Sequence, residues 1–155
     1  MTPAINKPLP EFEALATGGV KFTPQAFAGQ TVVLYFYPKD NTPGCTTEGE
    51  QFRDAYKKFH KAGAIVVGCS RDSLKSHENF KAKMNFPFEL IADADEKLCA
   101  QFDVIKMKNM YGKKVRGIVR STFLIDGAGR LAREWRGVKV DGHVDEVLAA
   151  VEALA

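Results

Sequence analysis

Apolar residues collect along this chain in short runs that are rich in β-branched and aromatic side chains. Runs of this length and composition are typical of strands whose two faces are both buried. They predict four central strands, at Thr31–Tyr37, Ala64–Cys69, Phe88–Ala92 and Val119–Ile125.

Two stretches between these strands repeat apolar residues at helical spacing instead. This spacing places the apolar side chains on one face, so each stretch is predicted to be an amphipathic helix that covers a sheet. The repeating positions are Phe52, Ala55, Tyr56, Phe59 and Ala62 in the first stretch, and Leu74, His77, Phe80, Lys81 and Met84 in the second.

The last part of the chain predicts a hairpin and a closing helix. The turn residues Asp126-Gly-Ala-Gly129 follow the fourth strand and favour antiparallel pairing with the segment after them. The order of elements predicts an α/β fold with a mixed sheet flanked by helices, and it resembles a thioredoxin fold with extra N-terminal strands. The closing helix starts near Asp141 and is expected to bury Val144, Val147, Leu148, Val151 and Leu154.

Composition adds limits on the class of protein. The 155 residues are 45% hydrophobic and contain no repeat or linker, so we expect a single domain over residues 1–155. No apolar run approaches the ~18 residues of a membrane span, and the start lacks the pattern of a secretory signal, so a cytoplasmic location is expected. The net charge of +3 is too small to indicate nucleic acid or membrane as the main partner.

One basic stretch stands out against this nearly balanced charge. We expect it to be a solvated loop rather than a site for phosphate or nucleic acid. It contains Lys106, Lys108, Lys113, Lys114 and Arg116.

The three cysteines, Cys45, Cys69 and Cys99, form no CxxC pair and have no histidine at the spacing of metal ligands. This argues against a disulfide framework and against a zinc site. Cys69 ends an apolar strand, and Cys99 lies on the apolar face of a short predicted helix, so both are expected to pack in the core.

Cys45 lies in a different setting, at the transition from a strand to a helix. A helix that begins near Pro43 or Gly44 places Cys45 in its first turn. The free backbone N–H groups and the positive end of the helix dipole there favour a thiolate over a thiol. Thr42 is expected to direct its hydroxyl into the same space, and Pro38 to form an apolar wall.

The spacing Pro38-x-x-x-Thr42-x-x-Cys45 resembles the active-site pattern of the peroxiredoxins. The longer segments YPKDNTPGCTTE and KNMYGKKVRGIVRSTFLID resemble the bacterioferritin comigratory protein, or PrxQ, subfamily, and the resemblance covers nearly the whole chain. It implies a thiol peroxidase in which Cys45 attacks a hydroperoxide and becomes a sulfenic acid. It also implies that Arg120 lies beside the sulfur and that Glu48 orients the surroundings.

This chemistry suits the residue types in the pattern. Breaking an O–O bond needs a thiolate, a substrate held in line and donors for the leaving oxygen. Cys45 supplies the thiolate, and Thr42, Arg120 and the backbone N–H groups of Gly44 and Cys45 are candidates for the donors. No metal, flavin or haem is required, so no cofactor is expected.

The chain departs from the subfamily where the sulfenic acid must be reduced. A resolving cysteine is common five residues after the reactive one or on the following helix, and these positions hold Glu50 and Lys81 here. We therefore favour an external thiol such as thioredoxin, glutaredoxin or glutathione. The alternatives are resolution by Cys69 or Cys99, or pairing of two Cys45 residues in a dimer, although the subfamily implies a monomer.

The same residues also bear on other classes of function. A peroxide-sensing redox relay, or a non-scavenging thioredoxin-fold interaction module, would use the same activated cysteine. A dithiol oxidoreductase is disfavoured because Cys45-Thr-Thr-Glu48 is not CxxC. A Cys-His hydrolase is disfavoured because His77 is predicted at a helix border and His60 and His143 at the surface.

Overall fold

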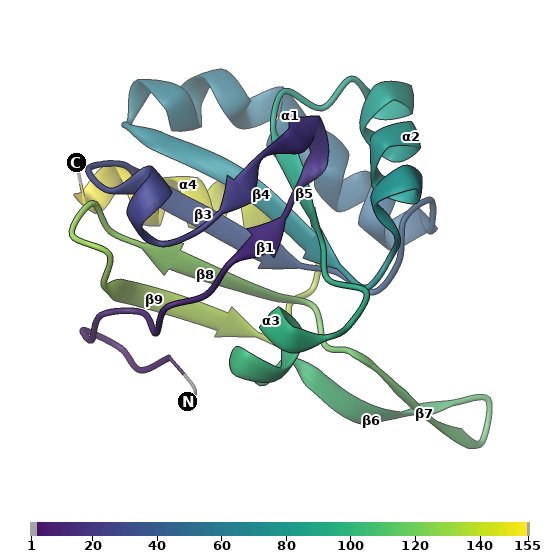
Figure 1. The fold of residues 1–155 in the computed structure, drawn as a ribbon. Helices are drawn as coiled ribbons and strands as arrows, with labels where there is room; N and C mark the ends of the chain where they lie inside the picture. The colour runs from purple at the N-terminus through teal and green to yellow at the C-terminus, as the bar shows by residue number, and fades with distance from the viewer. Residues whose placement is uncertain (1–2, 155) are drawn as a thin grey trace.

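The computed structural model describes residues 3–154, and a five-stranded mixed sheet lies at its centre. The strand order is β5-β4-β3-β8-β9, in which β3, β4 and β5 are parallel while β8 is antiparallel to both of its neighbours. The α/β fold with a mixed central sheet and a C-terminal hairpin is confirmed (Figure 1). The strands are β3 Thr31–Phe36, β4 Ala64–Ser70, β5 Glu89–Ala92, β8 Ser121–Ile125 and β9 Leu131–Arg136.

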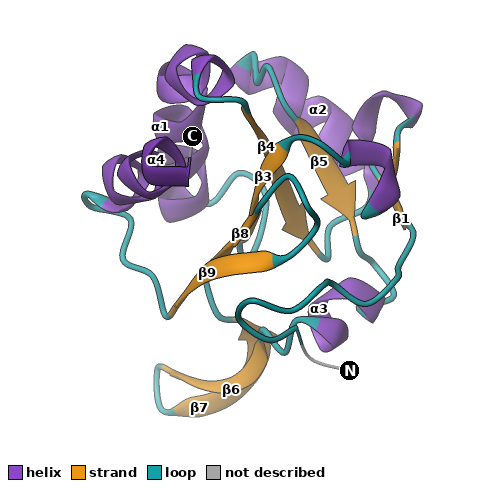
Figure 2. Cartoon of the chain, turned by 90° about the vertical axis from the view of Figure 1, so that its left-hand side faces the viewer, coloured by secondary structure: helices purple, strands orange, loops and turns teal. Residues whose placement is uncertain are grey.

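Four α-helices flank the sheet, and the two views show α1 and α4 on one side and α3 on the other (Figures 1 and 2). The helix periodicity of the sequence is confirmed for α1, α2 and α4. The bounds are α1 Pro43–Lys61, α2 Leu74–Met84, α3 Lys97–Gln101 and α4 His143–Leu154.

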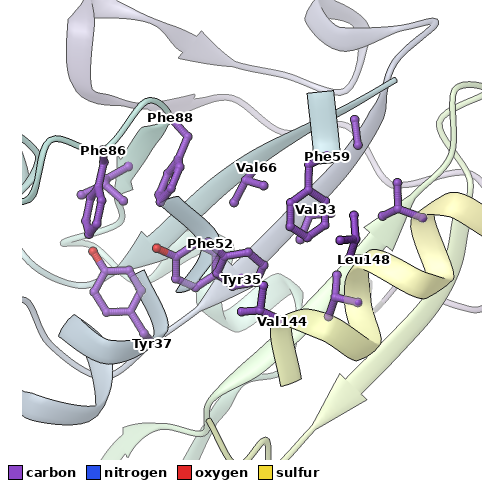
Figure 3. Close-up of a cluster of buried hydrophobic side chains, with 14 of the residues drawn as sticks. Val33, Tyr35, Tyr37, Phe52, Phe59, Val66, Phe86, Phe88, Val144 and Leu148 are labelled. Atoms are coloured by element: carbon purple, nitrogen blue, oxygen red, sulfur yellow. The ribbon is translucent and has the colours of Figure 1, made fainter. Parts of the chain in front are cut away.

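Alternate residues of the strands supply two separate cores, because successive side chains of a strand point to opposite faces. Val33 and Tyr35 of β3 pack in the first core with α1 and α4, whereas Leu34 and Phe36 pack in the second. Figure 3 shows the first core, where Tyr35 stacks on Phe52 of α1 with 4.6 Å between ring centroids. Side chains of the first core are therefore separated by the sheet from those of the second.

Two short N-terminal strands, β1 Ala14–Leu15 and β2 Lys21–Phe22, pair with each other as an extra hairpin. Two short 3-10 helices, Thr17–Gly19 and Gln25–Phe27, lie within and after this hairpin. The expected N-terminal additions to the thioredoxin-like fold are thus present.

The basic stretch is not a loop, so that prediction was wrong. It forms a second hairpin of β6 Ile105–Met110 and β7 Lys113–Ile118, paired from Ile105↔Ile118 to Met110↔Lys113. Tyr111 and Gly112 connect the strands with φ of 53° and 78°, the left-handed pair that tight hairpin turns use. Both views show this hairpin projecting from the body (Figures 1 and 2).

Two histidines that were expected at the border or the surface are buried. His77 is fully buried and lies 2.8 Å from both an Asp40 carboxylate oxygen and the Ile91 carbonyl oxygen. The Nε2 atom of His143 lies 2.8 Å from the hydroxyl oxygen of Thr122. Each ring has found a polar partner from a distant part of the chain, which makes burial possible.

Leu154 is 46% exposed at the end of α4, so it does not belong to the buried stripe, whereas His60 is exposed as predicted. No helix of residues 3–154 is long and apolar enough to cross a membrane.

Candidate active site

Cys45 lies in the first turn of α1, where the sequence places it. The helix begins at Pro43, whose missing N–H costs nothing at this position, and Thr42 is the residue that caps it. The backbone N–H of Thr46 donates to the carbonyl of Thr42 at 2.9 Å. The Cys45 side chain is only 2% exposed, so its sulfur is held in the first core beneath the positive end of the helix.

Arg120 joins this turn from the other side of the site, between β7 and β8. Its Nη2 donates to the sulfur of Cys45 at 3.5 Å, and its Nη1 donates to Glu48 Oε1 at 2.6 Å. Cys45 and Glu48 are three residues apart, so they lie on the same face of α1 and share one guanidinium. The structure thus brings together three of the residues that the sequence singled out.

Gly44 allows the guanidinium to approach this closely. A Cβ atom at this position would lie 3.1 Å from Arg120 Nη2, so another residue would require the guanidinium to shift by a few tenths of an ångström. The residue before Cys45 is therefore part of the geometry of the site.

Glu48 is fully buried and only half paired. Its Oε2 has no hydrogen-bond partner among the described residues, while Oε1 accepts from Arg120. Burial raises the pKa of Glu48 to about 7, although the Arg120 guanidinium opposes this rise. Burial lowers the pKa of Arg120, but the nearby Glu48 and Cys45 outweigh burial and raise the pKa overall. The guanidinium therefore stays charged.

The Thr42 hydroxyl is not directed at the sulfur in this structure. It donates to the carbonyl oxygen of Lys39 at 2.8 Å and so bridges the loop that leads to α1. Pro38 is half-buried at the start of this loop. Both residues lie in the segment that carries Cys45, but the structure shows neither of them in a hydrogen bond to it.

A buried polar network holds that loop, and the sequence reasoning missed it. Asp40 accepts hydrogen bonds from Tyr37 at 2.6 Å and from Ser76 at 2.8 Å, and its own N–H donates to Asp72 at 2.9 Å. Burial raises the pKa of Asp40, but hydrogen bonds from His77, Tyr37 and Ser76 outweigh this effect and lower it.

The two ring nitrogens of His77 complete the network between α2 and the loop. Nδ1 lies 2.8 Å from a carboxylate oxygen of Asp40 and Nε2 lies 2.8 Å from the Ile91 carbonyl oxygen, so the ring connects the loop to β5. The signal in the sequence was the series of polar residues directly after β3 and β4. These include Asp40 and Asp72, near the edge of the sheet where three parallel strands end.

Cys69 and Cys99 lie away from Cys45, in the second core on the opposite face of the sheet. Both are fully buried, and their sulfurs lie within 4.8 Å of each other and of an Asp93 carboxylate oxygen. Burial raises the pKa of Cys69, and Asp93 already accepts the N–H groups of Leu98 and Cys99. This cluster fits a packed core better than a metal site, since thiol metal ligands must be deprotonated.

The two positions where the resemblance to the PrxQ subfamily led us to expect a resolving cysteine hold charged groups in contact with other residues. Lys81 of α2 forms an ion pair with Glu89 of β5, and Glu89 also accepts the hydroxyl of Thr17 at 2.6 Å. Glu50 lies 3.8 Å from Arg53 on α1. Within residues 3–154, the structure places no second cysteine in the core that holds Cys45.

The chain is similar in sequence to known proteins over most of its length. The family model described as AhpC/TSA matches residues 5–133. Peroxiredoxin Bcp of Xanthomonas campestris is 58% identical over 139 residues, 90% of this chain and 87% of that protein. Peroxiredoxin Bcp of Bacillus subtilis is 46% identical over 155 residues, 100% of this chain and 99% of that protein.

Solved structures show the same likeness. A cysteine-to-serine mutant of Xylella fastidiosa PrxQ matches with a TM-score of 0.92 at 45% identity, covering 99% of this chain and 98% of that one. A structure of the Xanthomonas campestris bacterioferritin comigratory protein matches with a TM-score of 0.86 at 56% identity, covering 92% and 90%. That study describes the alkyl peroxide reduction activity of the Xanthomonas protein from trapped intermediate and ligand complexes.

Proposed function

The chain belongs to the AhpC/TSA family and is a thiol-dependent peroxidase of the Bcp/PrxQ type, and from this premise we propose that Cys45 is the residue that attacks the hydroperoxide. The observation that carries the proposal is the Arg120 guanidinium, 3.5 Å from a sulfur that also lies in the first turn of α1. Two sources of positive charge converge there on a buried cysteine.

In the first half of the reaction, this positive charge stabilises both the thiolate and the leaving oxygen. The Cys45 thiolate attacks one oxygen of the hydroperoxide, an S–O bond forms, and the O–O bond breaks. The electron pair leaves with the second oxygen, which takes a proton and departs as an alcohol or water. Arg120 and the free N–H groups of Gly44 and Cys45 stabilise the thiolate and then the charge that develops on the leaving oxygen.

Glu48 is a positioning residue in this proposal. Its hydrogen bond at 2.6 Å fixes one arm of the guanidinium and leaves the other arm for the sulfur and the substrate. Thr42 and Pro38 shape the loop through which the substrate reaches Cys45, Thr42 by bridging to the Lys39 carbonyl.

Hydrogen peroxide and organic hydroperoxides are the proposed substrates, and the alkyl peroxide activity of the Xanthomonas relative supports the second class. The sulfenic acid then needs two electrons, which two thiol groups supply as they form a disulfide and release water. We assign these thiols to an external reductant such as thioredoxin, glutaredoxin or glutathione. The position of Cys69 and Cys99 across the sheet supports this over resolution within the chain.

The proposed form is a cytoplasmic monomer. The resemblance to the PrxQ subfamily supports the monomer, and three free cysteines suit a reducing compartment. A dimer joined through two Cys45 residues is the alternative, and nonreducing electrophoresis after peroxide treatment separates the two.

One labelling experiment tests the assignment of Cys45. Reduced protein is treated with one equivalent of hydrogen peroxide, trapped with a sulfenate-specific probe, digested and mapped. We expect the label on Cys45, no turnover in Cys45→Ser, and unchanged turnover with dithiothreitol in the matched controls Cys69→Ser and Cys99→Ser. Label absent from Cys45, or full activity in Cys45→Ser, would contradict the proposal.

A further inference from the structure

The β6–β7 hairpin, residues 105–118, concentrates the positive charge of the chain. It contains five basic residues and no acidic residue. The rest of the chain has 17 basic residues against 19 acidic ones, so the body without this hairpin carries a net negative charge. The basic residues are Lys106, Lys108, Lys113, Lys114 and Arg116.

The same hairpin exposes apolar side chains. Tyr111 at the tip is 100% exposed, Met107 is 61% exposed and Val115 is 43% exposed. Tyrosine, methionine and arginine are enriched where proteins bind one another, because they offer large contact areas with a polar end. The hairpin, which projects from the body in Figure 1, thus combines a single sign of charge with exposed apolar side chains.

The base of the hairpin is fixed beside the active site. Arg116 Nη1 lies 2.6 Å from Glu96 Oε2, and Arg71 Nη1 lies 3.0 Å from the same oxygen, which ties β7 to the end of β4. Lys108 of β6 donates to the carbonyl of Ile118, two residues before Arg120. The hairpin therefore has a rigid base next to the residue that contacts Cys45 and a free tip.

Arg120, whose guanidinium lies 3.5 Å from the Cys45 sulfur, follows two residues after the end of β7 at Ile118. Burial lowers the pKa of Lys108, and Arg120 lowers it further, whereas Cys45 raises it. A protein docked on the hairpin would therefore lie beside the residue that contacts Cys45.

Resting on the proposed function, we propose that the β6–β7 hairpin docks an acidic dithiol protein that reduces the Cys45 sulfenic acid. One thiol of the partner attacks the sulfur of the sulfenic acid, forming a mixed disulfide and releasing water. The second thiol then attacks the partner's own sulfur in that bond, which frees Cys45 as a thiol and leaves the partner as a disulfide. Because Cys45 is only 2% exposed, it offers little contact area itself, and the neighbouring hairpin surface supplies the contacts with the partner.

Charge reversal at the tip tests this docking without touching the site. The variant Lys113→Glu/Lys114→Glu is assayed with an acidic thioredoxin, its reductase and NADPH. We expect kcat/KM for thioredoxin to fall about 10-fold at low ionic strength and to come within about 2-fold of the native value at 0.5 M salt, since salt screens exposed charges. The second-order rate with hydrogen peroxide and the turnover with uncharged dithiothreitol should not change.

The matched control is Lys57→Glu/Lys58→Glu, which makes the same charge change at two exposed positions of α1. Equal losses in both variants, or no loss in the hairpin variant, overturn the proposal. A hairpin variant that loses binding to a DNA duplex while keeping its thioredoxin kinetics overturns it in favour of nucleic acid.

Two further measurements keep the test independent of folding. For the native protein, kcat/KM should fall with salt when thioredoxin is the reductant and stay level with dithiothreitol. Tyr111→Ala should raise KM for thioredoxin several-fold without affecting the peroxide step. A wrong assignment of Cys45 would give a different result from a wrong docking site. The native protein would then show neither Cys45 sulfenate nor turnover with dithiothreitol.

Discussion

Replacing Arg120 by methionine removes the charge beside Cys45 while keeping an unbranched side chain of similar length. The sulfur loses a donor at 3.5 Å, and Glu48 Oε1 loses its hydrogen bond from the guanidinium. Because the pKa of Glu48 is already about 7, the buried carboxyl can take a proton and avoid standing as an unpaired charge. We therefore expect the variant to fold.

The size of the effect follows from the geometry. Two unit charges 3.5 Å apart attract by about 5 kcal/mol at an effective dielectric constant of ~20. Part of this attraction acts equally on the thiolate before the reaction and on the transition state, so only part of it lowers the barrier. Loss of one such donor costs about 10²–10³ in rate in other enzymes, and we expect a value near 10² here.

The measurement is the second-order rate of the reduced protein with hydrogen peroxide, obtained by competition with a haem peroxidase for limiting oxidant. Arg133→Met, an exposed arginine on β9, is the matched control and should keep the native rate. The double variant Arg120→Met/Glu48→Gln should be no slower than Arg120→Met, because Glu48 acts through the guanidinium. A loss smaller than about 3-fold in Arg120→Met would refute this account of the site.

Two other predictions concern stability. Gly49→Ala should lower the free energy of unfolding in urea by about 1–3 kcal/mol, because the new Cβ would lie 2.5 Å from the Phe86 ring; an unchanged midpoint would show that the ring moves freely. Burial lowers the pKa of His143 to about 4 from an ordinary value of 6.5, so the folded protein resists a proton that the unfolded chain accepts. Stability should therefore be complete above pH 6.5 and fall by about 2 kcal/mol as the pH drops toward 4, and His143→Gln should lose this part of the pH dependence.

The parts of the fold and site that were predictable depend on local signals. The run TVVLYFY is apolar throughout because β3 is buried on both faces, and Pro43 marks the helix start because a proline fits there at no cost. The position of Cys45 in the first turn follows from these two features alone. The pairing of Cys45 with Arg120 came from the family resemblance, because 75 residues separate them and no local pattern connects them.

The parts that were missed depend on partners far away in the sequence. The strands of the β6–β7 hairpin are largely solvent-exposed, so the buried apolar run that identified the other strands is absent. His77 and His143 lie at positions where a histidine could equally face water. Only the folded chain supplies Asp40 and Thr122 as the groups that make their burial tolerable.

Because the sheet separates Cys69 and Cys99 from Cys45, chemical modification of these two cysteines would report unfolding of the chain. Cys45, the proposed reactive cysteine, is buried in the first core, while Cys69 and Cys99 are fully buried in the second. On that proposal, oxidant that reacts at Cys45 leaves Cys69 and Cys99 unmodified as long as the protein stays folded. Modified Cys69 or Cys99 would therefore identify molecules that have unfolded at least locally, rather than molecules that have only reacted with peroxide.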